Sequence, residues 1–190
     1  MKKLLSVVLL IMSVLIFYSC TTNDFFDDIT ESDIRHQNIS IEYYNIAKAY
    51  EDQKNYAKAI DYYLLAQHDK KLRYAADYEL GRCYALNKDW DNAQKYYEKL
   101  LNRDPDNANI KISLAYITAM KGDLGKACAM YSSLVKENPY NCALLKNYIS
   151  ILITDGKYEM AEEQYYILKE RFPDDKDAEA ILSKIASSLK

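Results

Sequence analysis

The sequence contains few residues that break helices, with four glycines and three prolines among 190 residues. Gly and Pro are the least favourable residues inside an α-helix, so their scarcity favours helical segments joined at a small number of turns. Basic residues are also not in excess. The sequence has 25 Lys and Arg and 28 Asp and Glu, which gives a net charge of −3. A nucleic-acid-binding surface needs a basic excess, so we expect no nucleic-acid partner.

The residues that usually carry catalysis or hold metals are also scarce. The two histidines are His36 and His68, and the sequence has no Cys-x-x-Cys, no HExxH, no Gly-rich phosphate loop and no G-x-S-x-G. The acidic pairs at residues 27–28 and 174–175 lie in expected turns, where solvated or helix-capping carboxylates are the simpler interpretation. We therefore expect a protein that is not an enzyme and that has no metal and no cofactor.

In contrast, the sequence between residues 40 and 175 contains a pattern that recurs at a constant interval. This interval equals the separation between Ala59 and Ala93. Alanine recurs at this interval, a tyrosine follows each of these alanines after four residues, and the prolines share the spacing. The residues are Ala59, Ala93, Ala127 and Ala161, then Tyr63, Tyr97, Tyr131 and Tyr165, and finally Pro105, Pro139 and Pro173. Self-similarity at such a period indicates stacked supersecondary units.

This pattern resembles the tetratricopeptide repeat, in which W-x2-L-G-x2-Y is followed by A-x3-F and then P within a unit of about 34 residues. The second repeat resembles it best, with Leu80-Gly81, Tyr84, Trp90, Ala93, Tyr97 and Pro105. The resemblance implies an all-α fold, a right-handed superhelical solenoid of four helical hairpins. These hairpins are residues 40–73, 74–107, 108–141 and 142–175.

The remaining periodic features are predicted to be structural. The small residues Ala47, Gly81 and Ala115 occupy one position of the repeat, where they let the two helices of a hairpin approach each other. Asn107 and Asn141 are placed to cap the helices that follow them. Residues 176–190 are predicted to form a capping helix, because Ala178, Ile181, Ile185 and Leu189 make one apolar stripe.

The N-terminal segment up to Cys20 resembles the signal of a bacterial lipoprotein. Lys2 and Lys3 precede an uncharged run from Leu4 to Tyr18, which is too short for an ordinary membrane span and is followed by Ser19-Cys20. The resemblance implies that residues 1–19 are removed and that Cys20 is lipidated. The alternatives are an ordinary signal peptide or an uncleaved anchor helix. Residues 20–39 are polar, lack helical periodicity and are predicted to be a tether.

Three cysteines remain after Cys20, namely Cys83, Cys128 and Cys142. Along antiparallel helices, Cys128 and Cys142 are expected to lie about 12 Å apart, which is too far for a disulfide. We expect all three thiols to be free and to pack as small apolar side chains.

In tetratricopeptide proteins, the first helix of each repeat lines a concave groove where peptide segments bind. Transferred to this sequence, the groove is predicted to contain Tyr44, Lys48, Tyr78, Arg82, Asn109, Ile112, Tyr116 and Lys146. With the neighbouring positions included, the groove has three tyrosines and three cations against one acid, unlike the acidic chain as a whole. Tyr and Arg are enriched among residues that dominate interface energies. An alternative is that the three tyrosines only complete the packing between repeats.

These features together predict a non-enzymatic lipoprotein that serves as a protein–protein interaction scaffold in a bacterial cell envelope. It would be lipid-anchored to a membrane, face the periplasm or the cell exterior, and hold a segment of another envelope protein in its groove. The alternative function is a ligand-binding accessory lipoprotein of a solute transporter. An enclosed apolar cavity would favour that alternative, and an open groove with polar anchors would favour the scaffold.

Overall fold

The computed structural model describes residues 31–188. The chain divides into two compact units, residues 1–38 and 39–190, and each is considered by itself. The expected signal segment, the expected lipidation site Cys20 and most of the expected tether lie outside the described residues.

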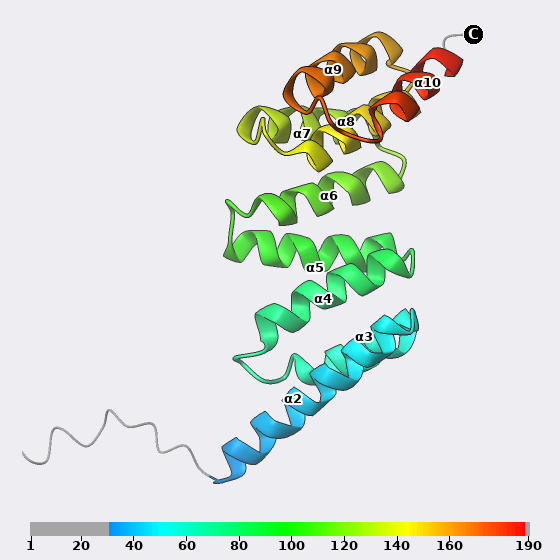
Figure 1. The fold of residues 1–190 in the computed structure, drawn as a ribbon. Coiled ribbons are helices and arrows are strands. Elements are labelled where there is room, and N and C mark those ends of the chain that lie inside the picture. The colour runs from blue at the N-terminus through cyan, green and yellow to red at the C-terminus, as the bar shows by residue number, and fades with distance from the viewer. Residues whose placement is uncertain (1–30, 189–190) are drawn as a thin grey trace, which may run out of the picture. The chain divides into compact units, whose positions relative to one another are not determined.

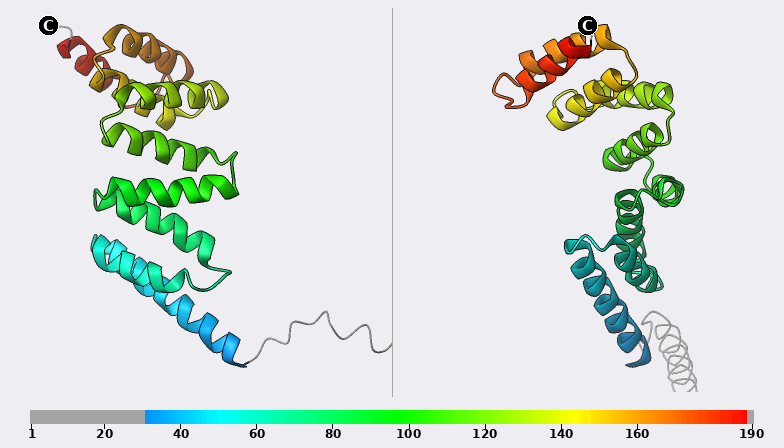
Figure 2. Two further views of the ribbon diagram at one scale, coloured as in Figure 1. Left: turned by 180° about the vertical axis from the view of Figure 1, so that it is seen from behind. Right: turned by 90° about the vertical axis from the view of Figure 1, so that its right-hand side faces the viewer.

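The described residues form nine α-helices and no strand (Figure 1). Their bounds are α2 Glu31–Asp52, α3 Tyr56–Ala66, α4 Arg73–Leu86, α5 Trp90–Arg103, α6 Ala108–Met120, α7 Leu124–Glu137, α8 Cys142–Thr154, α9 Tyr158–Arg171 and α10 Ala178–Ser188. Within residues 39–190, each helix from α3 to α10 packs against the next one along the chain. The views in Figure 2 show the same succession from other sides. The all-α solenoid predicted from the sequence is therefore confirmed.

Helix α2 starts earlier than the sequence suggested. The segment 20–39 was predicted to be a tether without helical periodicity, but residues 31–39 belong to α2, so this prediction is wrong for them. Polar side chains stabilise this part of the helix: Glu31 and Asp33 lie in the first turn, where carboxylates interact favourably with the helix dipole, and Arg35 pairs with Glu31 at 3.3 Å. Apolar periodicity could not reveal a helix stabilised in this way.

The turns between the two helices of each hairpin share one backbone geometry. A left-handed residue occurs at the same position of every repeat, namely Lys54 (φ 58°), Lys88 (φ 62°), Gly122 (φ 94°) and Gly156 (φ 73°). Glycine adopts this conformation without steric cost, whereas lysine does not. The first two repeats therefore maintain the same turn with a less suitable residue.

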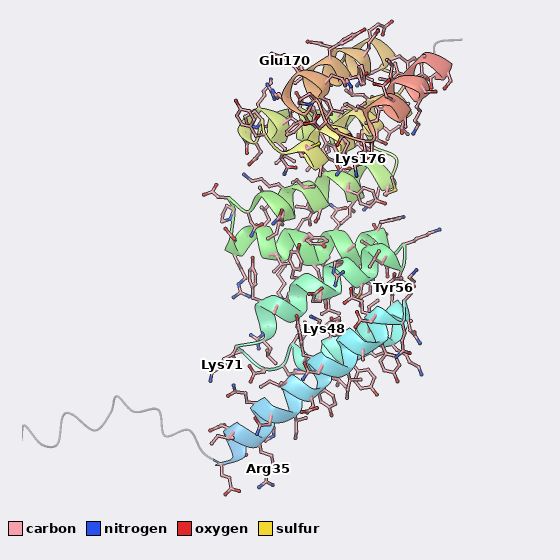
Figure 3. The ribbon with its side chains drawn as sticks, viewed as in Figure 1. Arg35, Lys48, Tyr56, Lys71, Glu170 and Lys176 are labelled. Atoms are coloured by element: carbon pink, nitrogen blue, oxygen red, sulfur yellow. The ribbon has the colours of Figure 1, made fainter. Side chains whose placement is uncertain are left out.

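Side-chain caps mark the starts of most helices. Asn107 accepts a hydrogen bond from the backbone N–H of Ile110, and Asn141 accepts one from Leu144, as predicted. The first repeat has Lys71 where the others have proline, and Figure 3 labels it in the turn between α3 and α4. There the carboxylate of Asp69 accepts from the backbone N–H groups of Lys71 and Leu72, at 2.7 and 3.1 Å. These bonds define the turn without the proline.

The repeated small and aromatic residues form the core. The four repeated alanines are fully buried, and the tyrosines that follow them are at most 4% exposed. Gly81 faces Tyr97 so closely that a Cβ atom would lie 3.1 Å from its ring. In α10, which falls in the segment predicted to form the capping helix, Ala178 and Ile185 are buried. Figure 3 shows the side chains that fill the spaces between successive helices.

The three cysteines within the described residues are free, as predicted. Cys83 and Cys128 are buried, and burial is the main cause that raises the pKa of Cys83 to about 12. Cys142 differs from the prediction because it is only half-buried, and its thiol donates to Oδ2 of Asp175 at 3.3 Å.

Candidate partner-binding surface

A hollow of about 330 Å³ opens between α4 and α6, the first helices of the second and third repeats. We call it the α4–α6 hollow. Its lining residues are Tyr78, Arg82, Ala85, Leu86, Tyr97, Ile112, Ser113, Tyr116, Ile117, Tyr131 and Asn147. Leu86 and Tyr116 are 46% and 45% exposed, whereas Tyr97 and Tyr131 are buried. The hollow is thus open to solvent at an apolar rim and has a floor of packed tyrosines.

Aromatic contacts hold the walls of the hollow in place. The ring of Tyr78 stands edge-on to Tyr97 at 5.9 Å, and Trp90 stands edge-on to Tyr116 at 6.1 Å. Such pairs contribute roughly 0.5–1.5 kcal/mol beyond their burial. Burial raises the pKa of Tyr97 and of Tyr131 to about 12, so both phenols stay neutral near pH 7. The hollow therefore offers a preorganised, uncharged aromatic surface.

The one charged residue of the α4–α6 hollow is neutralised by its neighbours. Arg82 forms an ion pair with Glu51 of α2, and its Nε donates to Glu79 at 2.8 Å. The side chain of Glu51 is only 8% exposed, and it also accepts a hydrogen bond from Tyr63 at 3.0 Å. Arg82 thus bridges two carboxylates and is not available as a free cation.

Four of the eight predicted groove residues line this hollow, namely Tyr78, Arg82, Ile112 and Tyr116. The other four do not. Tyr44 packs edge-on against Tyr63 at 5.2 Å, and burial followed by the charge of Glu79 raises its pKa. Lys48, which Figure 3 labels on α2, and Asn109 are exposed.

Lys146, the last of the eight, is also engaged. Its Nζ donates to Asp177 at 2.7 Å and to Asp175 at 2.9 Å, and these two bonds raise its pKa. The three cations counted against one acid do not leave this surface with an excess of free cations, because Glu51, the acid already counted, and Glu79 pair with Arg82. Asp175 and Asp177, which were not counted, pair with Lys146. The sequence argument counted charges on one face and omitted the residues that the fold brings beside them.

Several residues of the hollow were not among the predicted groove residues. Tyr97 and Tyr131 pack in the core, and they also form the floor of the hollow. Leu86 lies at the end of α4, and Asn147 comes from α8. Tyr97 and Tyr131 occupy the same position of successive repeats, so the repeat spacing could have indicated them. Asn147 occupies the repeat position of Ser113, which also lines the hollow, whereas no spacing rule indicates Leu86.

Among residues 31–188, no three His, Cys, Asp or Glu side chains gather closely enough to hold a metal ion. None of the helices within the same residues combines the length and apolar character that a membrane span requires.

Comparisons with known proteins agree with this geometry. Two family models described as tetratricopeptide repeat match residues 75–107 and residues 43–67. A protein of Treponema pallidum named "Uncharacterized lipoprotein" is 31% identical over 122 residues, which are 64% of this chain and 62% of that protein. The chain thus spans less than two thirds of this relative's length.

Solved structures show the same fold. A tetratricopeptide repeat protein from Parabacteroides merdae superposes with a TM-score of 0.68 at 19% identity, over 80% of this chain and 60% of that one. YrrB, described as a TPR protein with an unusual peptide-binding site, superposes with a TM-score of 0.58 at 17% identity, over 85% and 92%. At these identities the likeness shows the fold alone.

The helix order, the buried small residues and the structural neighbours together define an all-α repeat solenoid. More particularly, the fold is that of a tetratricopeptide-repeat solenoid, and residues 75–107 and 43–67 match the tetratricopeptide repeat itself.

Proposed function

We propose that this protein is a non-enzymatic, membrane-anchored scaffold of a bacterial cell envelope, and that it holds a segment of a partner protein in the α4–α6 hollow. Tetratricopeptide solenoids present extended surfaces to other proteins, which supports the scaffold role. The observation that carries the proposal is the open hollow itself, with an apolar rim at Leu86 and Tyr116 above a floor of tyrosines.

The charges around the hollow favour a partner segment that inserts an apolar or aromatic side chain. Because Glu51 and Glu79 neutralise Arg82, an acidic partner would gain little here and would have to compete with two carboxylates. Tyrosine rings present large, rigid contact areas and are enriched among residues that dominate binding energies. The side-chain amide of Asn147 lies in the lining and can orient the partner's backbone.

The relative's name supports the lipid anchor. The Treponema pallidum protein is called a lipoprotein, and here Cys20 follows an apolar run of signal-peptide character. Each acyl methylene buried in a membrane contributes roughly 0.8 kcal/mol, so more than one chain is needed for stable attachment. We expect Cys20→Ser to release the protein from membranes on fractionation. Retention of the variant would point instead to an uncleaved anchor helix.

The second candidate is a ligand-binding accessory of a solute transporter. The exposed rim of the α4–α6 hollow favours the scaffold over this alternative, because a small apolar ligand needs a more enclosed site to bury most of its surface.

Photocrosslinking in intact membranes tests the scaffold proposal. Benzoylphenylalanine replaces Tyr116 at the rim of the hollow or, as a matched control, Tyr166, which is 60% exposed on α9. We expect irradiation to produce a discrete protein adduct from position 116, identifiable by mass spectrometry, and none from position 166. Equal labelling from both positions, or an adduct with a small molecule only, would refute the proposed use of the hollow.

A further inference from the structure

We propose that a second surface of this protein, a hollow between α7 and α9, binds a polypeptide segment in which an apolar side chain stands next to carboxylates. This α7–α9 hollow is separate from the α4–α6 hollow, and the inference does not depend on the proposed function.

The α7–α9 hollow has a volume of about 370 Å³ and an apolar interior. The lining residues that matter here are Val135 and Lys136 of α7, Tyr148 of α8, and Met160, Ile167 and Arg171 of α9. Tyr148 is only 4% exposed and lies at the base, whereas Met160 is 44% exposed. An exposed methionine beside a hollow offers flexible apolar surface to an incoming side chain.

Both cations of this hollow lack a carboxylate partner among residues 31–188. Lys136 forms no ion pair or hydrogen bond there through its ammonium group. The adjacent Glu137 instead lies 3.9 Å from Lys111 and accepts from Ser133 at 3.0 Å. This arrangement differs from that of Arg82, which lines the other hollow while bridging two carboxylates.

Arg171 is held in position without being neutralised. Its Nη1 donates to the backbone carbonyl of Pro139 at 2.8 Å, and its guanidinium lies 6.0 Å from the ring centre of Tyr140. A guanidinium has five N–H donors, so most of them remain for a ligand. A fixed guanidinium with free donors suits a carboxylate, which it can bind through two parallel hydrogen bonds.

The repeat itself supplies an internal comparison. One repeat earlier, Asn102, Lys126 and Glu137 occupy the positions of Lys136, Met160 and Arg171. The equivalent surface between α5 and α7 therefore has an acid in place of the arginine and a lysine in place of the methionine. The combination of two unpaired cations with an apolar interior is not a by-product of the repeat pattern.

Charge complementarity identifies the occupant. The chain as a whole carries a net charge of −3, so an acidic segment is repelled by most of it and attracted where unpaired cations gather. The volume is near the lower end of the usual range for ligand sites, roughly 300–1,000 Å³, which fits a few side chains of a partner. The expected partner therefore inserts an apolar side chain while neighbouring carboxylates pair with Lys136 and Arg171.

The test uses the full chain in detergent and three fluorescein-labelled peptides of equal length. The first contains Leu-Phe flanked by Glu on both sides, the second has Lys in place of Glu, and the third has Ala in place of Leu and Phe. Fluorescence anisotropy measures affinity. We expect the first peptide to bind about tenfold or more tightly than either other peptide, since both charge and apolar contact are required.

Four variants locate the binding. Lys136→Asn and Met160→Lys copy residues that this chain already uses at the equivalent repeat positions, so both should fold normally, which circular dichroism checks. Each should weaken binding of the first peptide by about tenfold. The matched control, Lys95→Asn, removes an exposed lysine of α5 and should leave binding unchanged. Tyr116→Ala in the α4–α6 hollow should also leave it unchanged, which separates the two proposals.

Several results would overturn the inference. The first is equal affinity of the protein for the Glu and Lys peptides. The second is unchanged affinity of the folded Lys136→Asn and Met160→Lys variants for the first peptide. Binding of dodecanoate at this hollow without binding of any peptide would assign it to a small amphiphile instead. Self-association that Met160→Lys abolishes, again without peptide binding, would assign it to a second copy of the chain.

Discussion

Gly81 lies directly against the ring of Tyr97. A Cβ atom on Gly81 would be 3.1 Å from Cε2 of that tyrosine, which is 3% exposed and cannot move outward freely. The same tyrosine supports Tyr78 and forms part of the floor of the α4–α6 hollow. The packing of one hairpin and the shape of the candidate binding surface thus depend on a single close contact.

This contact makes a prediction about alanine substitution. Alanine is favoured over glycine inside a helix by up to about 1 kcal/mol. Gly125→Ala should show part of that gain, because nothing lies within 4 Å of the place that its Cβ atom would take. The Gly81→Ala variant should be less stable than the Gly125→Ala variant, because the ring of Tyr97 must shift to make room for the new Cβ atom. The larger side chain of Gly81→Val should destabilise the protein by roughly 1–3 kcal/mol. Urea titration followed by circular dichroism measures the order, and equal stability of the two alanine variants would contradict it.

The left-handed lysine in the second hairpin turn gives a second prediction. The left-handed conformation costs a non-glycine residue roughly 1–2 kcal/mol of steric strain that glycine avoids. Part of this advantage of glycine is offset, because glycine loses more conformational entropy when the chain folds. We therefore expect Lys88→Gly to raise the free energy of unfolding by up to about 1 kcal/mol. The reverse change in the third repeat, Gly122→Lys, should lower it by a similar amount. Chemical denaturation measures both changes, and a destabilised Lys88→Gly variant would show that the lysine side chain has another role.

The ion pairs of Arg82 predict a non-additive pair of substitutions. Arg82→Met leaves the nearly buried carboxylate of Glu51 without its cation and should cost roughly 1–3 kcal/mol, less than for a fully buried pair because Arg82 is 44% exposed. Adding Glu51→Gln should recover much of this loss, since the amide oxygen can still accept from Tyr63. Arg35→Met, which breaks the exposed pair with Glu31, is the control and should cost at most about 0.5 kcal/mol. Additive losses in the double variant would disprove the coupling.

Asp175 predicts a dependence of stability on acidity. The hydrogen bond from Lys146 is the main cause that lowers the pKa of Asp175. The ionised carboxylate of Asp175 therefore contributes its full stabilisation above the ordinary carboxyl pKa of about 3.9. This stabilisation is lost as the pH falls through the lowered pKa. We expect Asp175→Asn to be less stable than the unsubstituted protein at pH 6, with the difference shrinking below about pH 4. Thermal melts across this range measure it. Asp174→Asn, which removes the exposed neighbouring carboxylate, should show no such trend, and a pH-independent deficit in Asp175→Asn would refute the explanation.

The sequence predicted the fold more fully than the site, for physical reasons. Every repeat has an alanine at the position of Ala93 and a tyrosine at the position of Tyr97, because each hairpin meets the same packing constraint. The spacing of these residues alone therefore predicts the helices. The pairing of Arg82 with Glu79 is readable from a separation of three residues on one helix, but its pairing with Glu51 depends on how two repeats stack. The start of α2 escaped prediction because polar pairs, not apolar periodicity, stabilise it.

The internal neutralisation of Arg82 has a consequence for how the two surfaces respond to ionic strength. Salt screens attraction between exposed charges over about 10 Å at 0.1 M, but it affects apolar contact much less. Capture at the α4–α6 hollow, where Glu51 and Glu79 already satisfy the cation, should hardly change when sodium chloride is added. Binding at Lys136 and Arg171 should weaken steadily, so a simple salt titration can tell which face a newly found partner occupies.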